Sequence, residues 1–271
     1  MTVRDRFQLT GNAAEIYEAQ KVPAIFEPLA RLTLEAAALR DGQRVLDVAC
    51  GTGIVARLAA PMVAPTGRVV GADLNEGMVT VARSFKADGH APIEWHIADV
   101  TALPFPDGAF DLAVCQQGLQ FFPDRPAALD DVHRVLAPGG RLFATVWKGV
   151  NPLFGAIAEG LRRHVGTDAA ERALAPFALG DSEAVAALMR DRGFEDVAVE
   201  TIPIDRRIGP AEESIPLEID GGPVAREVAE AGDAVKARIV AETTAALADY
   251  RTADGFTIPQ PTFLYKARAA D

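Results

Sequence analysis

The stretch Val45–Ala60, with the sequence VLDVACGTGIVARLAA, constrains the fold of this chain more than any other. An apolar run enters a turn that carries Gly51 and Gly53, and the chain then continues with helical spacing of its apolar residues. A strand that passes through a glycine turn into a helix is typical of a nucleotide-binding loop, because glycine lets the backbone turn tightly beside a ligand. The stretch therefore predicts an α/β protein with a ligand at this turn.

Strands and helices continue to alternate after this stretch. Such alternation predicts parallel strands that are joined by crossover helices. Strands are expected at residues 44–49, 68–73, 93–97, 111–116, 141–147 and 197–204 and in the C-terminal segment PTFLYKARA, and helices at residues 53–63, 75–87, 126–135, 151–166 and 181–190.

The segments outside this alternation define two further parts of the chain. Residues 1–40 are expected to form N-terminal helices, which Pro23 and Pro28 divide. Residues 41–204 and 261–271 form the expected core, and residues 205–260 form an insertion with one long amphipathic helix at about 224–250. Connections of this length usually have a function, and we expect a cap that excludes water from the site. The alternatives are that the insertion packs against a second subunit, as in a homodimer, or extends the core.

Composition excludes several classes of partner. The 271 residues carry a net charge of −11 and no dense cluster of Lys and Arg, whereas a grip on nucleic acid needs a basic face. A small apolar or neutral molecule is the expected partner. The N-terminal residues lack the apolar core of a signal peptide, and no apolar run reaches membrane-spanning length, so we expect a cytoplasmic protein without a membrane partner. Cys50 and Cys115 form no C-x-x-C pair, which predicts packing roles and no metal site.

Carboxylates follow the predicted strands at the edge of the sheet where ligands of open parallel sheets bind. Asp73 ends the second strand about 20 residues after the glycine turn, where a carboxylate can accept both hydroxyls of a ribose. Asp99 follows the third strand and can accept a hydrogen bond from an exocyclic amine such as adenine N6. Leu74 and Met78 flank Asp73 and can enclose a flat base between them. Together these residues predict an adenosine site.

The residues around the end of the ligand opposite the adenosine indicate which cofactor binds. Gly51, Gly53 and Ala56 satisfy the dinucleotide pattern G-x-G-x-x-A, which fits NAD. A dinucleotide places a pyrophosphate at the start of the first helix, where the helix dipole attracts anions. Asp47 lies just before the turn, and its carboxylate repels a pyrophosphate but suits an ammonium or a sulfonium group. This argument favours S-adenosyl-L-methionine over NAD.

Four segments resemble the successive motifs of one family in their usual order: VLDVACGTG, VVGADLNEGMVTVAR, IADVTALPFPDGAFDLAVCQQGLQFFPD and VHRVLAPGGRLFATVW. They are similar to the class I S-adenosylmethionine-dependent methyltransferases, and most similar to the ubiquinone/menaquinone-biosynthesis, methyltransferase-11-like enzymes that act on small molecules. The resemblance covers about residues 40–150. It implies a Rossmann-like seven-stranded sheet of order 3-2-1-4-5-7-6 with the last strand antiparallel.

The resemblance also implies roles for particular residues. The methionine end of the cofactor is expected at Asp47, at the loop residues Ala49, Cys50, Gly51, Thr52 and Gly53, and at Tyr17 of the N-terminal helices, which usually cover the cofactor. Asp73 is expected to bind the ribose, Leu74 and Met78 to contact the base, Asp99 and Val100 to bind the adenine edge, and Gln116 to lie near the sulfonium and the acceptor. The Asn-Pro-Pro-Tyr motif of amide and base N-methyltransferases is absent, which disfavours DNA and glutamine as substrates.

The predicted reaction is an in-line displacement at an activated methyl group, which depends on positioning and a dry site more than on acid–base chemistry. His164 is a weak candidate for a general base, and Gln117 and Gln120 are expected in the acceptor pocket, with His164 beside them. The acceptor is expected to be small and hydrophobic or aromatic, and the sequence does not indicate an O, N or C acceptor atom. Two alternatives remain: a protein that binds S-adenosylmethionine without turnover, and an NAD-dependent oxidoreductase.

Overall fold

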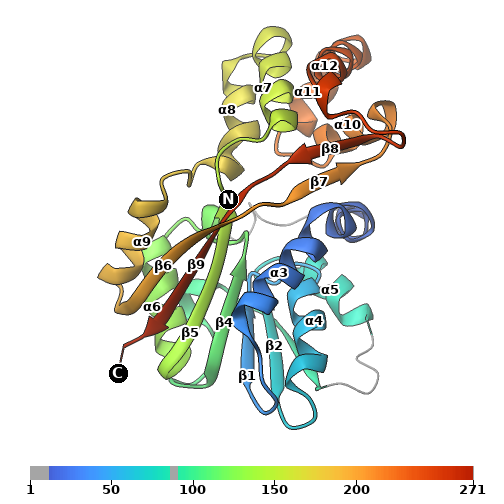
Figure 1. Ribbon diagram of the computed structural model, residues 1–271. Coiled ribbons are helices and arrows are strands. Elements are labelled where there is room, and N and C mark those ends of the chain that lie inside the picture. The colour runs from blue at the N-terminus through green and yellow to red at the C-terminus, as the bar shows by residue number, and fades with distance from the viewer. Residues whose placement is uncertain (1–11, 86–90, 271) are drawn as a thin grey trace. The chain divides into compact units, whose positions relative to one another are not determined.

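The computed structural model describes residues 12–85 and 91–270, shown in Figure 1. The chain forms two compact units, which are described one at a time. The first unit takes the described residues of Met1–Val146, Asp181–Ile202 and Phe263–Asp271. The second unit takes Trp147–Gly180 and Pro203–Thr262.

A seven-stranded sheet forms the centre of the first unit, in the order β3-β2-β1-β4-β5-β9-β6. Its strands are β1 (Arg44–Val48), β2 (Arg68–Asp73), β3 (Ile93–Ile97), β4 (Phe110–Gln116), β5 (Leu136–Trp147), β6 (Phe194–Ile202) and β9 (Thr262–Ala269). The pairs β1–β2, β1–β4, β2–β3 and β4–β5 are parallel, whereas β9 runs in the opposite direction (Figure 1). Because β9 is the last of these seven strands along the chain, the predicted order 3-2-1-4-5-7-6 is confirmed.

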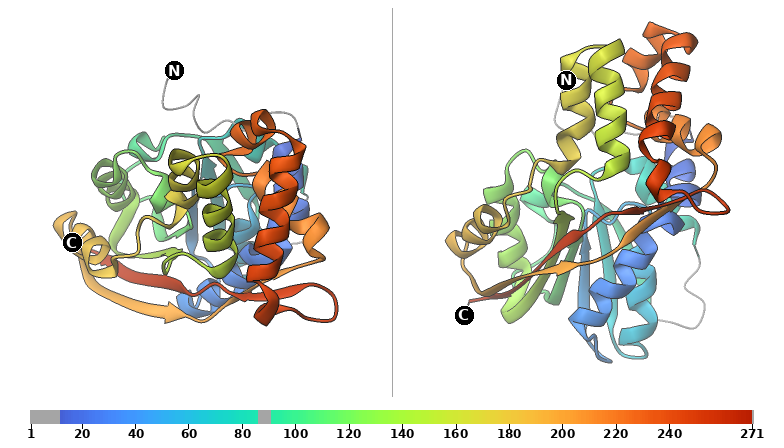
Figure 2. Two further views of the ribbon diagram at one scale, coloured as in Figure 1. Left: turned by 90° about the horizontal axis from the view of Figure 1, so that it is seen from above. Right: turned by 45° about the horizontal axis from the view of Figure 1, so that its top comes forward.

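Helices cover both faces of this sheet (Figures 1 and 2). One face carries α3 (Glu27–Ala37), α4 (Ile54–Val63) and α5 (Glu76–Ser84), and the other carries α6 (Arg125–Val135) and α9 (Ser182–Asp191). Asn75 and Asp181 start α5 and α9, because their side-chain oxygens accept backbone N–H groups of the first turn. The buried residues of α3 and α4 form one apolar cluster with side chains of β1, β2, β4, β5 and β9.

The N-terminal segment is a run of three helical pieces. α2 (Ala13–Ile16) passes into a π-helix, Tyr17–Phe26, which passes directly into α3. The two prolines were predicted to divide the helices, but neither does so. Pro23 lies inside the π-helix, and Pro28 lies in the first turn of α3. A proline is tolerated in a first turn because the N–H it lacks would have no partner there.

The second unit is built from helices and a β-hairpin. Its elements are α7 (Pro152–His164), α8 (Thr167–Leu174), α10 (Ala211–Asp220), α11 (Ala225–Ala231), α12 (Asp233–Ala246) and the antiparallel pair β7 (Asp205–Ile208) and β8 (Phe256–Pro259). The prediction of one long helix over 224–250 is wrong. Gly232 has φ +91°, outside the helical region, and it separates α11 from α12.

The division into units also differs from the predicted domains. Residues 147–180 were expected in the core, but they pack with the insertion. Leu153, Ile157 and Leu161 of α7 join one buried apolar cluster with Ile239 of α12. Gly160 allows this close packing, because a Cβ atom there would lie 3.1 Å from the Ile239 side chain. The apolar face of α7 therefore assigns it to the second unit.

A buried polar network ties the hairpin of the second unit to its helices. Arg206 of β7 donates from Nη1 to Glu218 Oε1 of α10 at 2.9 Å, and these side chains are only 5% and 7% exposed. Arg206 Nε also donates to Gln260 Oε1 at 3.4 Å, and the same oxygen accepts a hydrogen bond from Asn151 at the start of α7. The guanidinium of Arg206 therefore connects β7 to α10 and to Gln260, and Gln260 connects it further to the start of α7.

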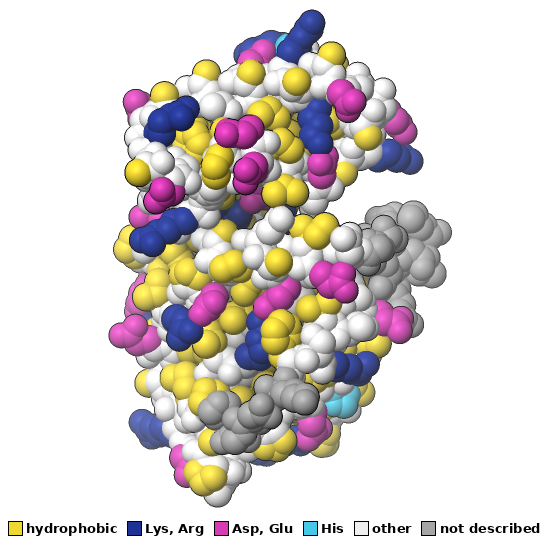
Figure 3. All heavy atoms as spheres, turned by 90° about the vertical axis from the view of Figure 1, so that its right-hand side faces the viewer, with side chains coloured by type: hydrophobic (Ala, Val, Ile, Leu, Met, Phe, Trp, Pro, Cys, Tyr) yellow, Lys and Arg dark blue, Asp and Glu magenta, His cyan; other side chains and the backbone are white. Residues whose placement is uncertain are grey.

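Charges of both signs are interspersed on the face of the molecule shown in Figure 3, without a basic patch. In the parts of the chain that the structure describes, every helix is too short or too polar to cross a membrane.

The buried ion pair of the second unit predicts that substitutions of two neighbouring arginines lower the free energy of unfolding by very different amounts. We expect Arg206→Met to lower the free energy of unfolding by about 3–5 kcal/mol, because it removes the cation that faces the buried Glu218 carboxylate. Arg207 is exposed on the same strand, so Arg207→Met should cost under about 0.5 kcal/mol. Urea unfolding of the two variants measures the difference, and equal costs would contradict this account of the network.

Candidate functional site

The loop after β1 has an unusual backbone. Ala49, Gly51 and Gly53 all have positive φ values, of 54°, 55° and 87°. A methyl group at Gly53 would overlap the indole of Trp95, so this glycine is required by packing. At Gly51 the nearest atom to such a methyl group would be Tyr17 Cε1, at 4.0 Å. The loop is therefore tightly packed at Gly53 and open at Gly51, beneath the Tyr17 ring.

Two carboxyl groups hold this loop, that of the buried Asp47 and that of the half-buried Asp73. Asp73 Oδ2 accepts from the Gly51 backbone N at 2.8 Å, and its Oδ1 accepts from the Asn75 N at 2.8 Å. Asp47 Oδ2 accepts from the Ala56 N at 3.0 Å. Burial raises the pKa of Asp73, and it raises the pKa of Asp47 to about 8, with a further contribution from the Asp73 charge. The structure thus brings together two acidic residues that the sequence places on separate strands.

The end of β3 joins the same edge of the sheet. The Ala98 N donates to the Asp73 carbonyl at 3.0 Å. Asp99 Oδ1 accepts from Thr101 N at 3.0 Å and from Thr101 Oγ1 at 2.8 Å, and this starts a short 3-10 helix at Val100. Leu74 and Met78, beside Asp73 and in the first turn of α5, are half-buried.

The end of β4 lies against the loop after β1, because a Cβ atom at Gly118 would be 2.8 Å from the Ala49 Cβ. Gln116 Nε2 donates to the Phe26 carbonyl of the π-helix at 3.0 Å. Gln117 has φ +56°, and its backbone N donates to the Thr145 carbonyl at 3.0 Å. Gln120 Nε2 donates to Gln117 Oε1 at 2.9 Å. Both residues predicted for the acceptor pocket are therefore buried and bonded to each other.

Several buried oxygens around this edge have no hydrogen-bond partner among the described residues. They are Glu18 Oε2, Thr52 Oγ1, Gln116 Oε1 and Gln120 Oε1. Buried polar atoms are normally paired, so atoms of this kind indicate where a ligand donates. With the acidic side chains of Asp47 and Asp73, they make a site that is rich in acceptors and that a cation would render negative by favouring the ionised carboxylates. Such a site fits a cationic ligand with many donors, as S-adenosyl-L-methionine is, and not a pyrophosphate.

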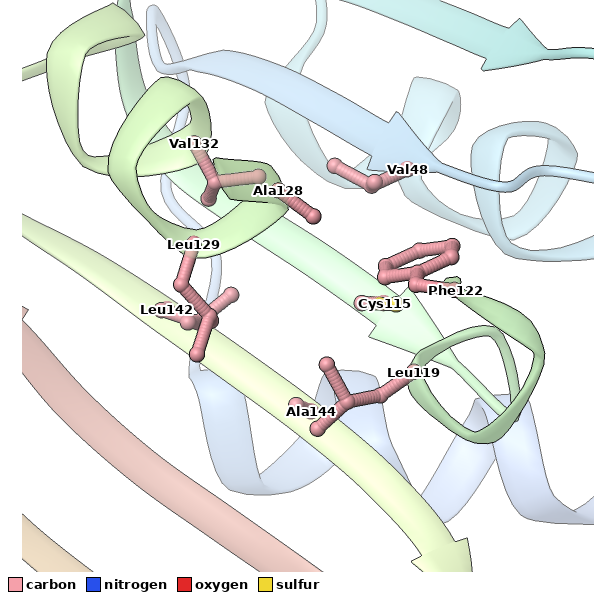
Figure 4. A pocket seen from close by; sticks show the side chains of 9 residues that line it. All are labelled: Val48, Cys115, Leu119, Phe122, Ala128, Leu129, Val132, Leu142 and Ala144. Atoms are coloured by element: carbon pink, nitrogen blue, oxygen red, sulfur yellow. The ribbon is translucent and has the colours of Figure 1, made fainter. Parts of the chain in front are cut away.

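A small apolar pocket lies next to this edge, on the face of the sheet that α6 covers (Figure 4). Its lining is entirely apolar, with Cys115 and Phe122 nearest the end of β4; the other side chains are Val48, Leu119, Ala128, Leu129, Val132, Leu142 and Ala144. Cys50 and Cys115 are both buried, which agrees with the packing roles predicted for them. Burial raises the pKa of the Cys115 thiol to about 12, so it stays protonated at neutral pH.

His164 belongs to α7 of the second unit, where its Nε2 lies 2.8 Å from Glu242 Oε1 of α12. This contact joins α7 to α12 within the second unit, and the expected position of His164 beside the acceptor stays a prediction. Among residues 12–85 and 91–270, no three His, Cys, Asp or Glu side chains gather as metal ligands.

The sequence analysis missed three residues that shape the loop. Trp95 fills the space over Gly53, and Arg57 contacts both Glu18 and the Thr52 carbonyl. One signal was available for Arg57, since a basic residue one turn into the helix can reach back to the carbonyls of the preceding loop. No local signal pointed to Trp95 or Glu18, because their contacts depend on the folded sheet.

Comparison with known proteins agrees with this geometry. Residues 46–144 match the family described as a methyltransferase domain. Together with the order of the sheet, the match shows that this part of the chain belongs to the class I S-adenosylmethionine-dependent methyltransferases, whose cofactor is S-adenosyl-L-methionine. The resemblance inferred from the four sequence motifs is confirmed for this domain.

Among curated relatives, the chain is 41% identical over 130 residues to the ubiquinone/menaquinone biosynthesis C-methyltransferase UbiE of Ectopseudomonas mendocina. That alignment covers 47% of this chain and 51% of the relative, so the chain spans about half the length of the curated relatives it matches.

Solved structures extend the likeness of the fold. The Haemonchus contortus phosphoethanolamine N-methyltransferase 2 in complex with S-adenosyl-L-methionine is 22% identical, with a TM-score of 0.62 over 100% of this chain and 60% of that one. The YcgJ protein of Bacillus subtilis is 18% identical, with a TM-score of 0.60 over 89% of this chain and 98% of that one. At these identities the two structures show a shared fold alone.

The raised pKa of Asp47 predicts how stability depends on pH. The folded protein keeps a proton on Asp47 up to a pH of about 8, whereas an unfolded Asp releases it near 3.8. The stabilisation from this group is therefore full below pH 3.8 and is lost as the pH rises to about 8, at about 1.4 kcal/mol per pKa unit. Asp47→Asn mimics the protonated side chain, so we expect its unfolding free energy to fall less than that of the wild type between pH 5 and about 8.

Chemical denaturation across this pH range, without cofactor, measures both slopes. Asp130→Asn serves as the control, because Asp130 is exposed and should leave the wild-type slope unchanged. Parallel pH profiles for the wild type and Asp47→Asn would show that Asp47 is ionised in the folded protein.

Proposed function

We propose that this protein transfers a methyl group from S-adenosyl-L-methionine to a small hydrophobic or aromatic molecule. The observation that carries the proposal is the acceptor-rich, acidic edge of the sheet around Asp47 and Asp73. A pyrophosphate brings only acceptors and negative charge, so the same edge argues against an NAD-dependent oxidoreductase. The cofactor supplies a methyl group that its sulfonium activates, and the residues of the chain bind, orient and shield it.

We assign the adenosine half of the cofactor to the ends of β2 and β3. The Asp73 carboxylate has acceptor capacity beyond its bonds to Gly51 and Asn75, and we assign the ribose hydroxyls to it. Leu74 and Met78 would contact the base. Asp99 and the backbone at Val100 would bind the adenine edge, with Asp99 Oδ2 available beside the Oδ1 that Thr101 uses.

We assign the methionine half to the loop after β1. Asp47 and the backbone of Ala49, Cys50, Gly51, Thr52 and Gly53 would hold it, with the Tyr17 ring over Gly51. An ammonium group near Asp47 would favour ionisation of this carboxyl, so binding of the cofactor should release a proton below a pH of about 8. Gln116 would lie at the reacting end, where its unpaired Oε1 can orient an acceptor.

The curated relatives support the class of acceptor. The curated relatives carry the name ubiquinone/menaquinone biosynthesis C-methyltransferase, which supports an apolar ring compound as acceptor. The family match ends at residue 144 and leaves out the whole second unit. We assign the acceptor pocket to Gln117 and Gln120, with His164 beside them, and attribute further selection of the acceptor to residues outside the match.

Calorimetric titration tests the choice of cofactor. We expect S-adenosyl-L-methionine and S-adenosylhomocysteine to bind at micromolar concentrations and NAD not to bind, and tighter binding of NAD would overturn the proposal. Transfer of a labelled methyl group to a panel of small aromatic and apolar molecules then tests activity. Binding without transfer to any acceptor would favour the alternative of a protein that binds the cofactor without turnover.

Two glycine variants separate ligand binding from backbone strain. Gly51→Ala and Gly139→Ala both place a side chain at positive φ, at 55° and 73°, and each should cost about 1–2 kcal/mol of stability. A methyl group at Gly51 would project into the opening beneath Tyr17, whereas at Gly139, at the start of β5, it meets nothing within 4 Å. We expect Gly51→Ala to weaken binding of S-adenosylhomocysteine at least tenfold and Gly139→Ala to leave it unchanged. Equal affinities in titration calorimetry would place the ligand elsewhere.

A further inference from the structure

The guanidinium of Arg57 joins three segments of the first unit that are distant in the sequence. Its Nη2 donates to Glu18 Oε1 of the π-helix at 2.6 Å, and its Nη1 donates to the carbonyl of Thr52 in the glycine loop. Its Cζ also lies 4.0 Å from the centre of the Phe85 ring, just after α5. Arg57 itself is in the second turn of α4, so one side chain links the N-terminal segment, the glycine loop and the end of α5.

The ion pair of Arg57 with Glu18 is more enclosed than most of the ion pairs in the structure. Both side chains are only 18% exposed, whereas those of the Arg68–Glu94 pair are 44% and 46% exposed. Exposed pairs contribute little because water screens them, but an enclosed, charge-assisted hydrogen bond is stronger. The Arg57–Glu18 pair is therefore a real constraint on the N-terminal segment.

The N-terminal segment lies over the glycine loop and is held at two places. Glu18 binds Arg57 near its start, and the Phe26 carbonyl accepts from Gln116 Nε2 at its end. Tyr17, the residue before Glu18, stacks on Phe26 with ring centres 5.2 Å apart, and its Cε1 is the atom nearest to a Cβ built at Gly51. The piece between these contacts is a π-helix, a rare conformation that often marks a functional site.

These contacts have a consequence for any ligand that binds at Gly51. Such a ligand lies between the glycine loop and the Tyr17 ring, so the N-terminal segment must separate from the loop before the ligand can leave. Opening at Glu18 requires the loss of its bond to the guanidinium, while Arg57 stays bonded to the Thr52 carbonyl. Glu18 also carries a second carboxylate oxygen that is buried without a partner among the described residues.

We propose that Arg57 is a positioning residue that latches the N-terminal segment onto the glycine loop through Glu18, and that this latch sets how long the cofactor stays bound. The inference rests on the proposed function, because it assumes that S-adenosyl-L-methionine binds at this loop. The latch acts on closure of the site and takes no part in the transfer of the methyl group.

The test measures the rate at which S-adenosylhomocysteine dissociates, by stopped-flow tryptophan fluorescence. Trp95 packs on Gly53 and so reports on the loop. We expect Glu18→Gln to raise the dissociation rate about tenfold, equivalent to about 1.4 kcal/mol, with little change in the association rate. Glu15→Gln is the matched control, since Glu15 is exposed on α2 of the same segment, and it should behave as the wild type.

The dependence of the dissociation rate on salt concentration distinguishes a latch from a general loss of structure. Raising NaCl from about 0.05 M to about 0.5 M should speed dissociation from the wild type and leave Glu18→Gln unchanged, because only the wild type has an ion pair to screen. The ligand should dissociate from Arg57→Met as fast as from the double variant Arg57→Met/Glu18→Gln, because the loss of Arg57 alone already removes its bond to Glu18. Wild-type dissociation rates and salt dependence in Glu18→Gln would overturn the latch alone, whereas a wild type that binds no S-adenosylhomocysteine would overturn the proposed function with it.

Discussion

The bond from the Asp73 carboxylate to the Gly51 backbone is the interaction on which the rest of the site depends. In the parallel pairing of β1 with β2, Val48 is opposite Ala72, so Asp73 comes directly beside the start of the glycine loop. One oxygen of Asp73 accepts a hydrogen bond from the Gly51 backbone, and the other accepts one from Asn75, the N-cap residue of α5. A single carboxylate thereby fixes the loop after β1 and the start of the helix after β2.

This arrangement has an electrostatic cost that the loop alone does not offset. Burial raises the pKa of both Asp47 and Asp73, and the charge of Asp73 raises that of Asp47 further. Arg57 is the cation whose charge lowers the pKa of Asp47, but its hydrogen bonds go to Thr52 and Glu18. A ligand with positive charge relieves the remaining repulsion, so affinity for such a ligand and pH-dependent stability of the empty loop share one physical origin.

The sequence predicted the sheet well because its strands are apolar runs that end at glycines and carboxylates. The limits of β2 and β3 agree with the residues expected from RVVGAD and from Ile93–Ile97. The second unit was harder to predict, because Gly232 breaks a pattern that is otherwise helical and because β7 and β8 are short strands. A hairpin with a short turn carries a local signal, but some fifty residues separate these two strands, and their pairing depends on the packing of the intervening helices.

The candidate site likewise contains residues whose positions could be predicted from the sequence and contacts that could not. Asp47, Gly51, Asp73 and Asp99 were predictable, because the end of each strand can be counted along the sequence and parallel strands bring these ends together. The contacts of Arg57 with Glu18 and of Gln116 with Phe26 were not predictable, since they join residues 39 and 90 positions apart through side chains. The assignment of His164 to the acceptor pocket rested on its position after β5 alone, and its bond to Glu242 was not predictable because it joins residues 78 positions apart.

Strain and unpaired oxygens occur together at the carboxyl ends of two neighbouring strands of the first unit. Of the four non-glycine residues with positive φ in the described part of the chain, Ala49 follows β1 and Gln117 follows β4. Thr52 and Gln116, which lie beside them, carry buried oxygens without a partner. Each such feature costs on the order of 1–3 kcal/mol, so a sheet selected for stability alone would not retain several of them at one edge. They persist here because the apolar cluster of α3, α4 and the central strands stabilises the unit without them, which leaves this edge free to be shaped by what it binds.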